Sequence, residues 1–288
     1  MKNLKLKNLF VLIFSLMLFV YDAYGIIEIL QVSNATSTQI YVPIIMYHNV
    51  KSTQLGKDTI TQSEFESDLK YLSENNYNTI TMTQLINYVY SDEELPPNPI
   101  ILTFDDGLLN TYLNVFPLLK KYNMKIVLSI IGLSSEKFSN TVDININYSH
   151  VTWDQIKEMD ESGLVEIQNH SYDMHNIKGG RYGCSQRNDE KLDGYEKYIT
   201  NDVAMFNEKI KLAIDTIPNA FTYPYGKYNE NTESIIKKLG FKATISCNFG
   251  VNVISKDKEC LYELKRINRS HNQGIEKMIK QGMKTINN

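Results

Sequence analysis

The chain has 288 residues, of which 42% are hydrophobic and 22% are charged, and its formal net charge is −3 at pH 7. This composition is ordinary for one globular domain with its own core. Because no block of basic residues occurs, we expect no nucleic-acid partner. We find no internal repeat, low-complexity tract or linker that would divide the domain.

The N-terminal segment has the pattern of a secretory signal. Three lysines precede an uninterrupted apolar run over residues 9–20, and small residues follow at Ala23 and Gly25. The run is shorter than the roughly 20 residues that a membrane span needs. An uncleaved anchor stays open as an alternative.

We therefore expect a signal peptide or N-terminal anchor over residues 1–25, a short linker over 26–40 and one catalytic domain over 41–288. The protein should be secreted or attached to the cell surface, as a monomer, with peripheral or anchored membrane association if the first segment is retained. Its cysteines are Cys184, Cys247 and Cys260. One disulfide with a spare thiol and three unpaired thiols both stay open.

Beyond the linker, strand and helix patterns alternate along the chain. Strands are expected at residues 43–47, 78–81, 100–104, 125–131, 164–168, 220–223, 243–246 and 264–267. Helices are expected at residues 61–75, 82–90, 110–122, 152–162, 199–216, 230–239 and 274–283, the first with a capping box formed by Thr61 and Glu64. Segments 134–150 and 176–197 are polar, and we treat them as loops. About seven βα units of this kind predict an α/β fold, a (β/α) barrel.

A pair of carboxylates follows the apolar strand at residues 100–104. Asp105 and Asp106 lie where this strand should leave the sheet, and Gly107 permits a tight exit. Two neighbouring acids shift each other's pKa values unless a cation intervenes. A metal ligand beside a general base is one arrangement that uses such a pair, and a solvated turn is the alternative.

A pair of histidines follows a later strand, at residues 164–168. His170 and His175 are two of only five histidines in the chain. Neutral imidazole is a common ligand of zinc and similar ions. The spacing of five does not suit one face of a helix but suits a ligand loop. Taken with Asp106, the pair favours a metal site over a structural role.

Three motifs together resemble the polysaccharide deacetylases, the NodB-homology or carbohydrate esterase family 4 group. They are Thr-Phe-Asp-Asp-Gly at 103–107, His-Ser-Tyr-Asp-Met-His at 170–175 and Phe-Thr-Tyr-Pro-Tyr-Gly at 221–226. Segments 42–48 and 153–159 also look like the branch that contains poly-N-acetylglucosamine deacetylases. The resemblance extends from about residue 43 to residue 269 and implies a distorted barrel of the NodB-homology type.

The resemblance also implies roles for individual residues. Asp106, His170 and His175 would hold one divalent metal ion, zinc first, with cobalt and nickel as alternatives. Asp105 would be the general base. The backbone N–H of Tyr225 would stabilise the oxyanion of the tetrahedral intermediate.

The chain departs from the family pattern at three places. The usual later Asp-x-x-Asp-Trp-like motif is missing, and the other two departures concern catalytic groups. Thr222 stands where many members carry an arginine, so the group that orients Asp105 is missing, and Arg266 is one candidate for it. The usual Leu-x-His near the C-terminus, which supplies the general acid, is also absent. His48, after the first strand of the barrel, and His271 are the two candidates for the proton donor.

These observations predict a secreted, metal-dependent N-deacetylase of N-acetylglucosamine-containing polysaccharide, such as exopolysaccharide, peptidoglycan or a chitin-like polymer. An O-acetyl esterase acting on xylan or another acetylated glycan is the alternative enzyme. A non-catalytic glycan-binding protein on the same fold is a third hypothesis. The partner in each case is a polysaccharide, and the polar segments 134–150 and 176–197 are candidate walls of its groove.

Overall fold

The computed structural model describes residues 39–91 and 93–286. The predicted signal peptide and the linker up to residue 38 lie outside these residues. Within the described ranges, no helix combines the length and the apolar character that a membrane span requires. Cys184, Cys247 and Cys260 are all free, so the alternative with three unpaired thiols is the one observed.

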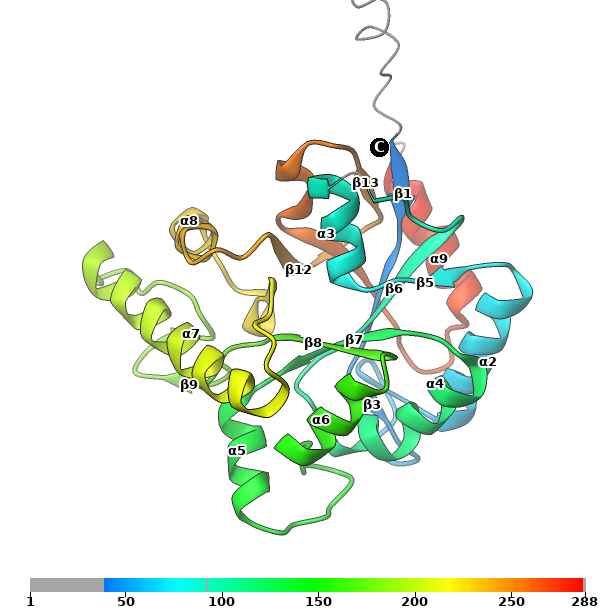
Figure 1. Cartoon of the computed structure of the whole chain (residues 1–288), viewed down its shortest axis with the longest axis horizontal. Coiled ribbons are helices and arrows are strands. Elements are labelled where there is room, and N and C mark those ends of the chain that lie inside the picture. The colour runs from blue at the N-terminus through cyan, green and yellow to red at the C-terminus, as the bar shows by residue number, and fades with distance from the viewer. Residues whose placement is uncertain (1–38, 92, 287–288) are drawn as a thin grey trace, which may run out of the picture. The chain divides into compact units, whose positions relative to one another are not determined.

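Seven parallel strands form a closed barrel (Figure 1), which confirms the predicted (β/α) barrel. Each strand pairs with the next one in chain order, and the last pairs with the first. The strands are β2 (Ile44–Tyr47), β6 (Pro99–Phe104), β7 (Ile126–Ile130), β8 (Val165–Asn169), β11 (Ala220–Thr222), β12 (Ala243–Phe249) and β14 (Leu264–Asn268). A short strand, β5 (Asn78–Thr79), extends the sheet beyond β6.

The barrel is distorted on the side of β11. This strand meets β8 at a single register pair, Phe221 with Asn169, and the pairing of β12 with β14 shifts register between Ile245 and Phe249. On the other side, β2 and β7 are buried along their whole length. Strands buried on both faces explain why the sequence shows continuous apolar runs rather than alternation.

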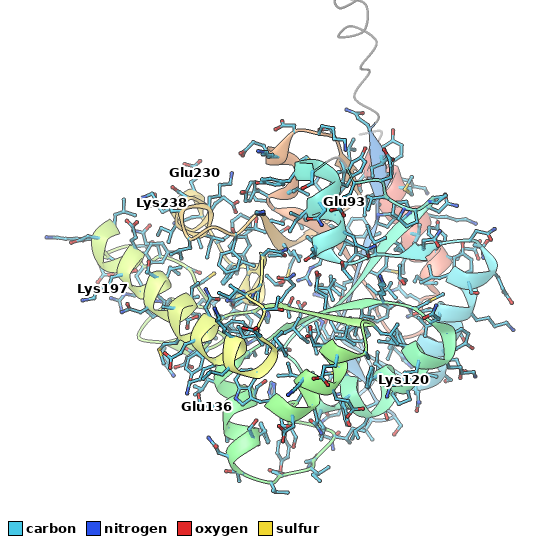
Figure 2. The ribbon with its side chains drawn as sticks, viewed as in Figure 1. Glu93, Lys120, Glu136, Lys197, Glu230 and Lys238 are labelled. Carbon is cyan, nitrogen blue, oxygen red and sulfur yellow. The ribbon has the colours of Figure 1, made fainter. Side chains whose placement is uncertain are left out.

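Helices lie outside the strands (Figure 1). They are α2 (Gln62–Glu74), α3 (Met82–Ser91), the π-helix η1 (Thr111–Val115) continuing into α4 (Phe116–Tyr122), α5 (Gly132–Asn140), α6 (Trp153–Glu161), α7 (Leu192–Ile214), α8 (Glu230–Lys238) and α9 (Ile275–Met283), with short 3₁₀ turns η2 (Pro224–Gly226), η3 (Lys258–Leu261) and η4 (Lys284–Ile286). The predicted capping box of Thr61 and Glu64 begins α2. Figure 2 shows charged side chains such as Lys197 and Glu230 pointing away from the barrel.

Both segments predicted as polar loops contain regular structure. Segment 134–150 includes most of α5, whose composition is too polar to show a helical period. Segment 176–197 includes a hairpin of β9 (Ile177–Lys178) and β10 (Arg181–Tyr182) and the first turns of α7. Helix α7 begins before the predicted residue 199 because Tyr195 is buried and extends the apolar stripe by one turn.

Two short pairs outside the barrel were not predicted. β1 (Ile40–Val42) pairs antiparallel with β13 (Asn252–Ile254), and β3 (Asn49–Val50) pairs with β4 (Thr59–Ile60). The first pair begins at the last residue of the predicted linker. In a barrel of parallel strands, the carboxyl ends share one face, where catalytic groups collect. The predicted site residues follow those ends.

Candidate active site

Asp106, His170 and His175 converge at the carboxyl ends of β6 and β8. Asp106 Oδ1 lies 3.5 Å from His170 Nε2 and 3.3 Å from His175 Nε2. One ligand atom from each residue lies within 4.8 Å of the other two. The chain turns sharply at this point because Asp106 and Gly107 both have positive φ, 72° and 70°. A Cβ on Gly107 would lie 2.9 Å from Ile130 Cγ2, so glycine is required there.

His170 is held in one tautomer by a backbone carbonyl. Its Nδ1 lies 2.8 Å from the carbonyl oxygen of Thr222, in a buried contact. Since a carbonyl only accepts hydrogen bonds, Nδ1 carries the proton, and Nε2 is the ring nitrogen on the side of Asp106 and His175, where it can act as a metal ligand. This is the arrangement of a metal-ligating histidine. Thr222 thus contributes to the site through its backbone, although many proteins of the family that the sequence resembles carry an arginine at this position.

The charge balance of the three residues suits a bound cation. Burial alone would raise the pKa of Asp106, but the two imidazoles outweigh it and hold this pKa below its ordinary value. Burial, together with His170, lowers the pKa of His175 to about 4, so this ring is neutral at pH 7. Asp106 Oδ1 is buried and has no hydrogen-bond partner among the residues that the structure describes. A carboxylate and two imidazoles of this kind fit a divalent ion such as zinc.

Asp105 forms a buried ion pair with Arg266. Nη1 and Nη2 of Arg266 donate to the two carboxylate oxygens at 2.7 and 2.8 Å. Arg266 also donates to the carbonyl of Ser246 and the hydroxyl of Thr103, so its guanidinium is fixed on several sides. Burial raises the pKa of Asp105, but the charge of Arg266 outweighs it and the net shift is downward. Arg266, a candidate from the sequence, therefore occupies the place beside Asp105.

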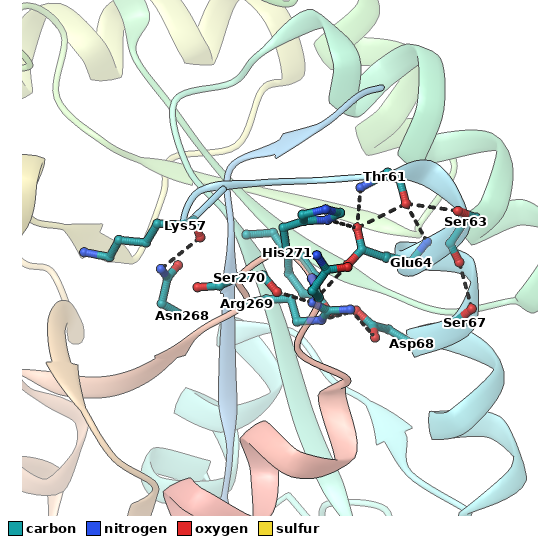
Figure 3. A network of polar contacts seen from close by, with 12 residues as sticks. Lys57, Thr61, Ser63, Glu64, Ser67, Asp68, Asn268, Arg269, Ser270 and His271 are labelled. Carbon is teal, nitrogen blue, oxygen red and sulfur yellow. Dashed lines mark hydrogen bonds and ion pairs between the residues drawn. The ribbon is translucent and has the colours of Figure 1, made fainter. Parts of the chain in front are cut away.

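The two candidate proton donors lie in different surroundings. His48 Nε2 lies 3.8 Å from Asp105 Oδ2, and the side chain is partly exposed. Its Nδ1 has no hydrogen-bond partner within residues 39–91 and 93–286. His271 instead places Nδ1 2.8 Å from Glu64 Oε2, in a polar network at the start of α2 (Figure 3). The structure brings His48, and not His271, into contact with Asp105.

Tyr225 lies beside His175. It follows Pro224 in η2, has a left-handed backbone with φ of 57°, and packs its ring against that of His175 with 4.1 Å between centroids and a tilt of 35°. Left-handed residues other than glycine are uncommon and often occur at functional sites. The role of its N–H toward an oxyanion stays a prediction.

Two supporting residues were missed in the sequence. Asp202, in α7, accepts hydrogen bonds from the backbone N–H groups of Tyr172 and Asp173, between the two ligand histidines, at 2.7 Å each. His150 Nδ1 lies 2.9 Å from the carbonyl oxygen of Asp106. A usable signal existed for Asp202, because it interrupts the apolar stripe of α7 at a buried position. His150 showed no such signal.

Comparison with known proteins identifies the family. The model of the polysaccharide deacetylase family matches residues 92–244, more than half of the chain. The chain belongs to this family. Its predicted family and enzyme class are thereby confirmed.

Individual relatives agree with this assignment. YxkH of Bacillus subtilis (strain 168), named for the same family, is 29% identical over 226 residues, which cover 78% of this chain and 70% of that protein. The poly-beta-1,6-N-acetyl-D-glucosamine N-deacetylase of Escherichia coli (strain K12) is 25% identical over 227 residues, 72% of this chain. The chain spans only 34% of that relative's length. A solved de-N-acetylase from Aggregatibacter actinomycetemcomitans superposes with a TM-score of 0.72 at 25% identity, covering 85% of this chain and 100% of that one.

Proposed function

We propose that this protein is a metal-dependent N-deacetylase that removes acetyl groups from an N-acetylglucosamine-containing polysaccharide outside the cytoplasm. The observation that carries the proposal is that two functional units adjoin at neighbouring residues of the chain, the Asp106–His170–His175 cluster and the Asp105–Arg266 pair with His48. The relatives named for N-deacetylation of poly-N-acetylglucosamine support the substrate class. The signal pattern of residues 1–25 supports export.

Asp106, His170 and His175 would hold the metal, with zinc as the first candidate. A divalent ion there would supply positive charge that polarises an acetyl carbonyl and acidifies a water molecule. Thr222 keeps His170 Nε2 available as a ligand through the bond at Nδ1. His175 is already neutral at pH 7, so it needs no deprotonation to bind the ion.

Asp105 is the proposed general base. Arg266 keeps its carboxylate ionised at neutral pH and fixes both oxygens, so that a proton can be accepted at a defined position. The same guanidinium makes Asp105 a weak base, which requires a water that is already acidified. A base held this firmly needs no rearrangement when the proton is transferred.

His48 is the proposed general acid, and the backbone N–H of Tyr225 is the proposed oxyanion donor. His48 Nε2 lies close to Asp105 Oδ2, and the side chain reaches solvent, so a protonated imidazole can meet a departing amine on the open side of the site. Tyr225 lies next to His175, where an acetyl oxygen would lie. The N–H of a residue in this place would stabilise the developing negative charge.

Acetate release from defined substrates tests the proposal. The purified protein, supplied with zinc, cobalt or nickel, is assayed on N-acetylglucosamine oligosaccharides with β-1,6 and β-1,4 linkages, and on acetylated xylan. We expect release from the amide substrates and its loss in Asp105→Asn. Release from acetylated xylan alone would identify an O-acetyl esterase. Binding of the oligosaccharides without any release, in fully metal-loaded protein, would identify a glycan-binding protein.

A further inference from the structure

Three aromatic rings form a continuous row that begins at the candidate metal site. The ring of Tyr225 lies 4.1 Å from that of His175 and 4.6 Å from that of Tyr182, measured between centroids. The two tyrosine rings are nearly parallel, with an interplanar angle of 9°. Tyr182 comes from the β9–β10 hairpin and Tyr225 from η2, so the row joins two separate segments.

Backbone packing holds the hairpin tightly against η2. Gly183 follows Tyr182 with φ of +61°, and a Cβ there would lie 2.8 Å from the carbonyl oxygen of Pro224 and 3.2 Å from Tyr225 Cδ2. Only glycine permits this approach. Gly183 N–H also donates to the carbonyl of Asn176, which closes the hairpin. The positions of the two tyrosine rings are therefore set before any ligand arrives.

The rings remain accessible despite this tight packing. Tyr182 is 39% exposed and Tyr225 is 37% exposed, which is unusual for large rings stacked on each other. Tyr225 lies between Tyr182 and His175, so the face available to a sugar is the outer face of Tyr182. This face carries partial negative charge and attracts the partially positive C–H hydrogens that line one face of a β-linked pyranose. The ammonium of Lys227 lies 5.8 Å from the Tyr182 ring centroid and offers a hydrogen-bond donor for sugar hydroxyls.

We propose that Tyr182, supported from behind by Tyr225 (together the tyrosine platform), binds a sugar ring of the substrate polymer next to the reacting unit. This proposal rests on the proposed function and specifies how the enzyme binds its polymeric substrate. Because Tyr225 separates Tyr182 from His175, a sugar on Tyr182 is a neighbour of the unit being deacetylated and not that unit itself. The enzyme should therefore favour oligomers over single sugars.

Kinetics on substrates of different length test the tyrosine platform. For a β-linked N-acetylglucosamine oligosaccharide of five units, Tyr182→Ala should lower kcat/KM roughly two- to tenfold, mainly through KM, as expected for one lost aromatic contact. Activity on an aryl acetate, which cannot reach the platform, should stay unchanged. Tyr182→Phe keeps the ring and should retain nearly all activity on both substrates.

A matched control comes from the opposite end of the barrel. Tyr41, in β1 before the first barrel strand, is 47% exposed. Tyr41→Ala should leave the activity on both substrates unchanged. Thermal melting and metal content should match the wild-type protein in all variants. If Tyr182→Ala lowers turnover of the aryl acetate as much as that of the oligosaccharide, the ring only supports Tyr225 and the proposal is wrong. An unchanged KM for the oligosaccharide would contradict it as well.

Binding separates this proposal from the proposed function. Titration calorimetry with the same oligosaccharide is carried out on Asp105→Asn, with and without Tyr182→Ala. Weaker binding in the double variant supports the platform even if the wild-type protein releases no acetate, a result that would overturn only the proposed function. Equal binding in both proteins, with normal acetate release by the wild type, would overturn only the platform.

Discussion

Arg266 donates hydrogen bonds to both carboxylate oxygens of Asp105, at 2.7 and 2.8 Å, although the two residues are 161 positions apart in the sequence. The guanidinium is supplied by β14, whereas the family pattern places an arginine on β11, where this chain has Thr222. The same charge can therefore reach Asp105, the proposed general base, from a different strand. Since both groups are buried, neither can be removed without leaving the other unpaired.

Arg266→Lys should lower turnover at least tenfold while metal content stays unchanged. Lysine keeps the positive charge but cannot donate two parallel hydrogen bonds, so Asp105 would lose its fixed orientation. Arg266→Met should also lower the free energy of unfolding by about 3–5 kcal/mol, because it leaves a buried carboxylate without its partner. Acetate release, elemental analysis and urea denaturation measure these effects. Normal turnover in Arg266→Lys would show that orientation of Asp105 does not matter.

Asp105 and Asp106 should respond differently to the same substitution. Asp105→Asn should keep the bound metal and lose most turnover, since the base is removed and the ligands remain. Asp106→Asn and His170→Ala should lose metal as well as rate. Chelation should abolish wild-type activity, and added zinc, cobalt or nickel should restore it. Full activity in protein shown by elemental analysis to be free of metal would contradict the mechanism.

His48→Ala should lower turnover of N-acetyl substrates by about 10²–10⁴-fold, the usual contribution of a general acid. Metal content should be unchanged because His48 is not one of the three residues of the Asp106–His170–His175 cluster. An activated aryl acetate expels a phenolate that hardly needs a proton, so the variant should keep much of its activity on it. His271→Ala is the control, since its ring is bound to Glu64. If His271→Ala lowered turnover strongly and His48→Ala only mildly, His271 and not His48 would be the general acid.

Asp202→Ala should weaken metal binding by roughly 10- to 100-fold, the range found for residues that orient metal ligands. Without its carboxylate, the N–H groups of Tyr172 and Asp173 lose their acceptor, and the loop between the ligand histidines loosens. Asp202→Asn keeps one acceptor oxygen and should show a smaller loss. Competition with a chelator of known affinity gives these values. Asp193→Asn, an exposed site at the start of α7, is the control, and equal metal affinity in all variants would rule out this role.

Glu64 should make the stability of the protein depend on pH in the acidic range. Burial raises the pKa of Glu64, but hydrogen bonds from Thr61, His271 and the backbone of Asn272 outweigh it and lower this pKa to about 2 (Figure 3). A carboxyl whose pKa is lowered by folding stabilises the protein above its usual pKa, and this stabilisation is lost as the pH falls toward the lowered value.

Glu64→Gln should therefore lower the free energy of unfolding by about 1.5–3 kcal/mol at pH 7, the range for hydrogen bonds to a charged group. The difference in the free energy of unfolding between the wild type and Glu64→Gln should shrink as the pH falls from about 5 toward 2. Thermal or urea unfolding across this range measures it. Glu196→Gln is the control, because its ion pair with Lys238 is exposed and should matter little. A difference that stays constant with pH would show that the Glu64 charge is not the cause.

Local patterns were enough to predict the barrel and the convergence of Asp106, His170 and His175. Apolar runs ending in Asp105 and Asp106, or in His170, place these residues at strand ends, and parallel strands bring such ends to one face. The sequence indicated Arg266 as a candidate partner of Asp105 but could not predict their contact, because this contact depends on closure of the barrel. Asp202 depends on how α7 packs against the ligand loop. Helix α5 was missed because its residues are mostly polar and show no helical period.

The pairing of the last barrel strand with the first has a consequence for when the protein can act. β14 carries Arg266 and pairs with β2, which leads to His48, and the two strands are more than two hundred residues apart. Contacts over such distances form late, since a long stretch of chain must be ordered first. Until that seam forms, Asp105 has no guanidinium to hold it. The site around Asp105 is therefore complete only once β14 has joined β2, and a chain in which this seam is open lacks the ion pair that fixes the proposed base.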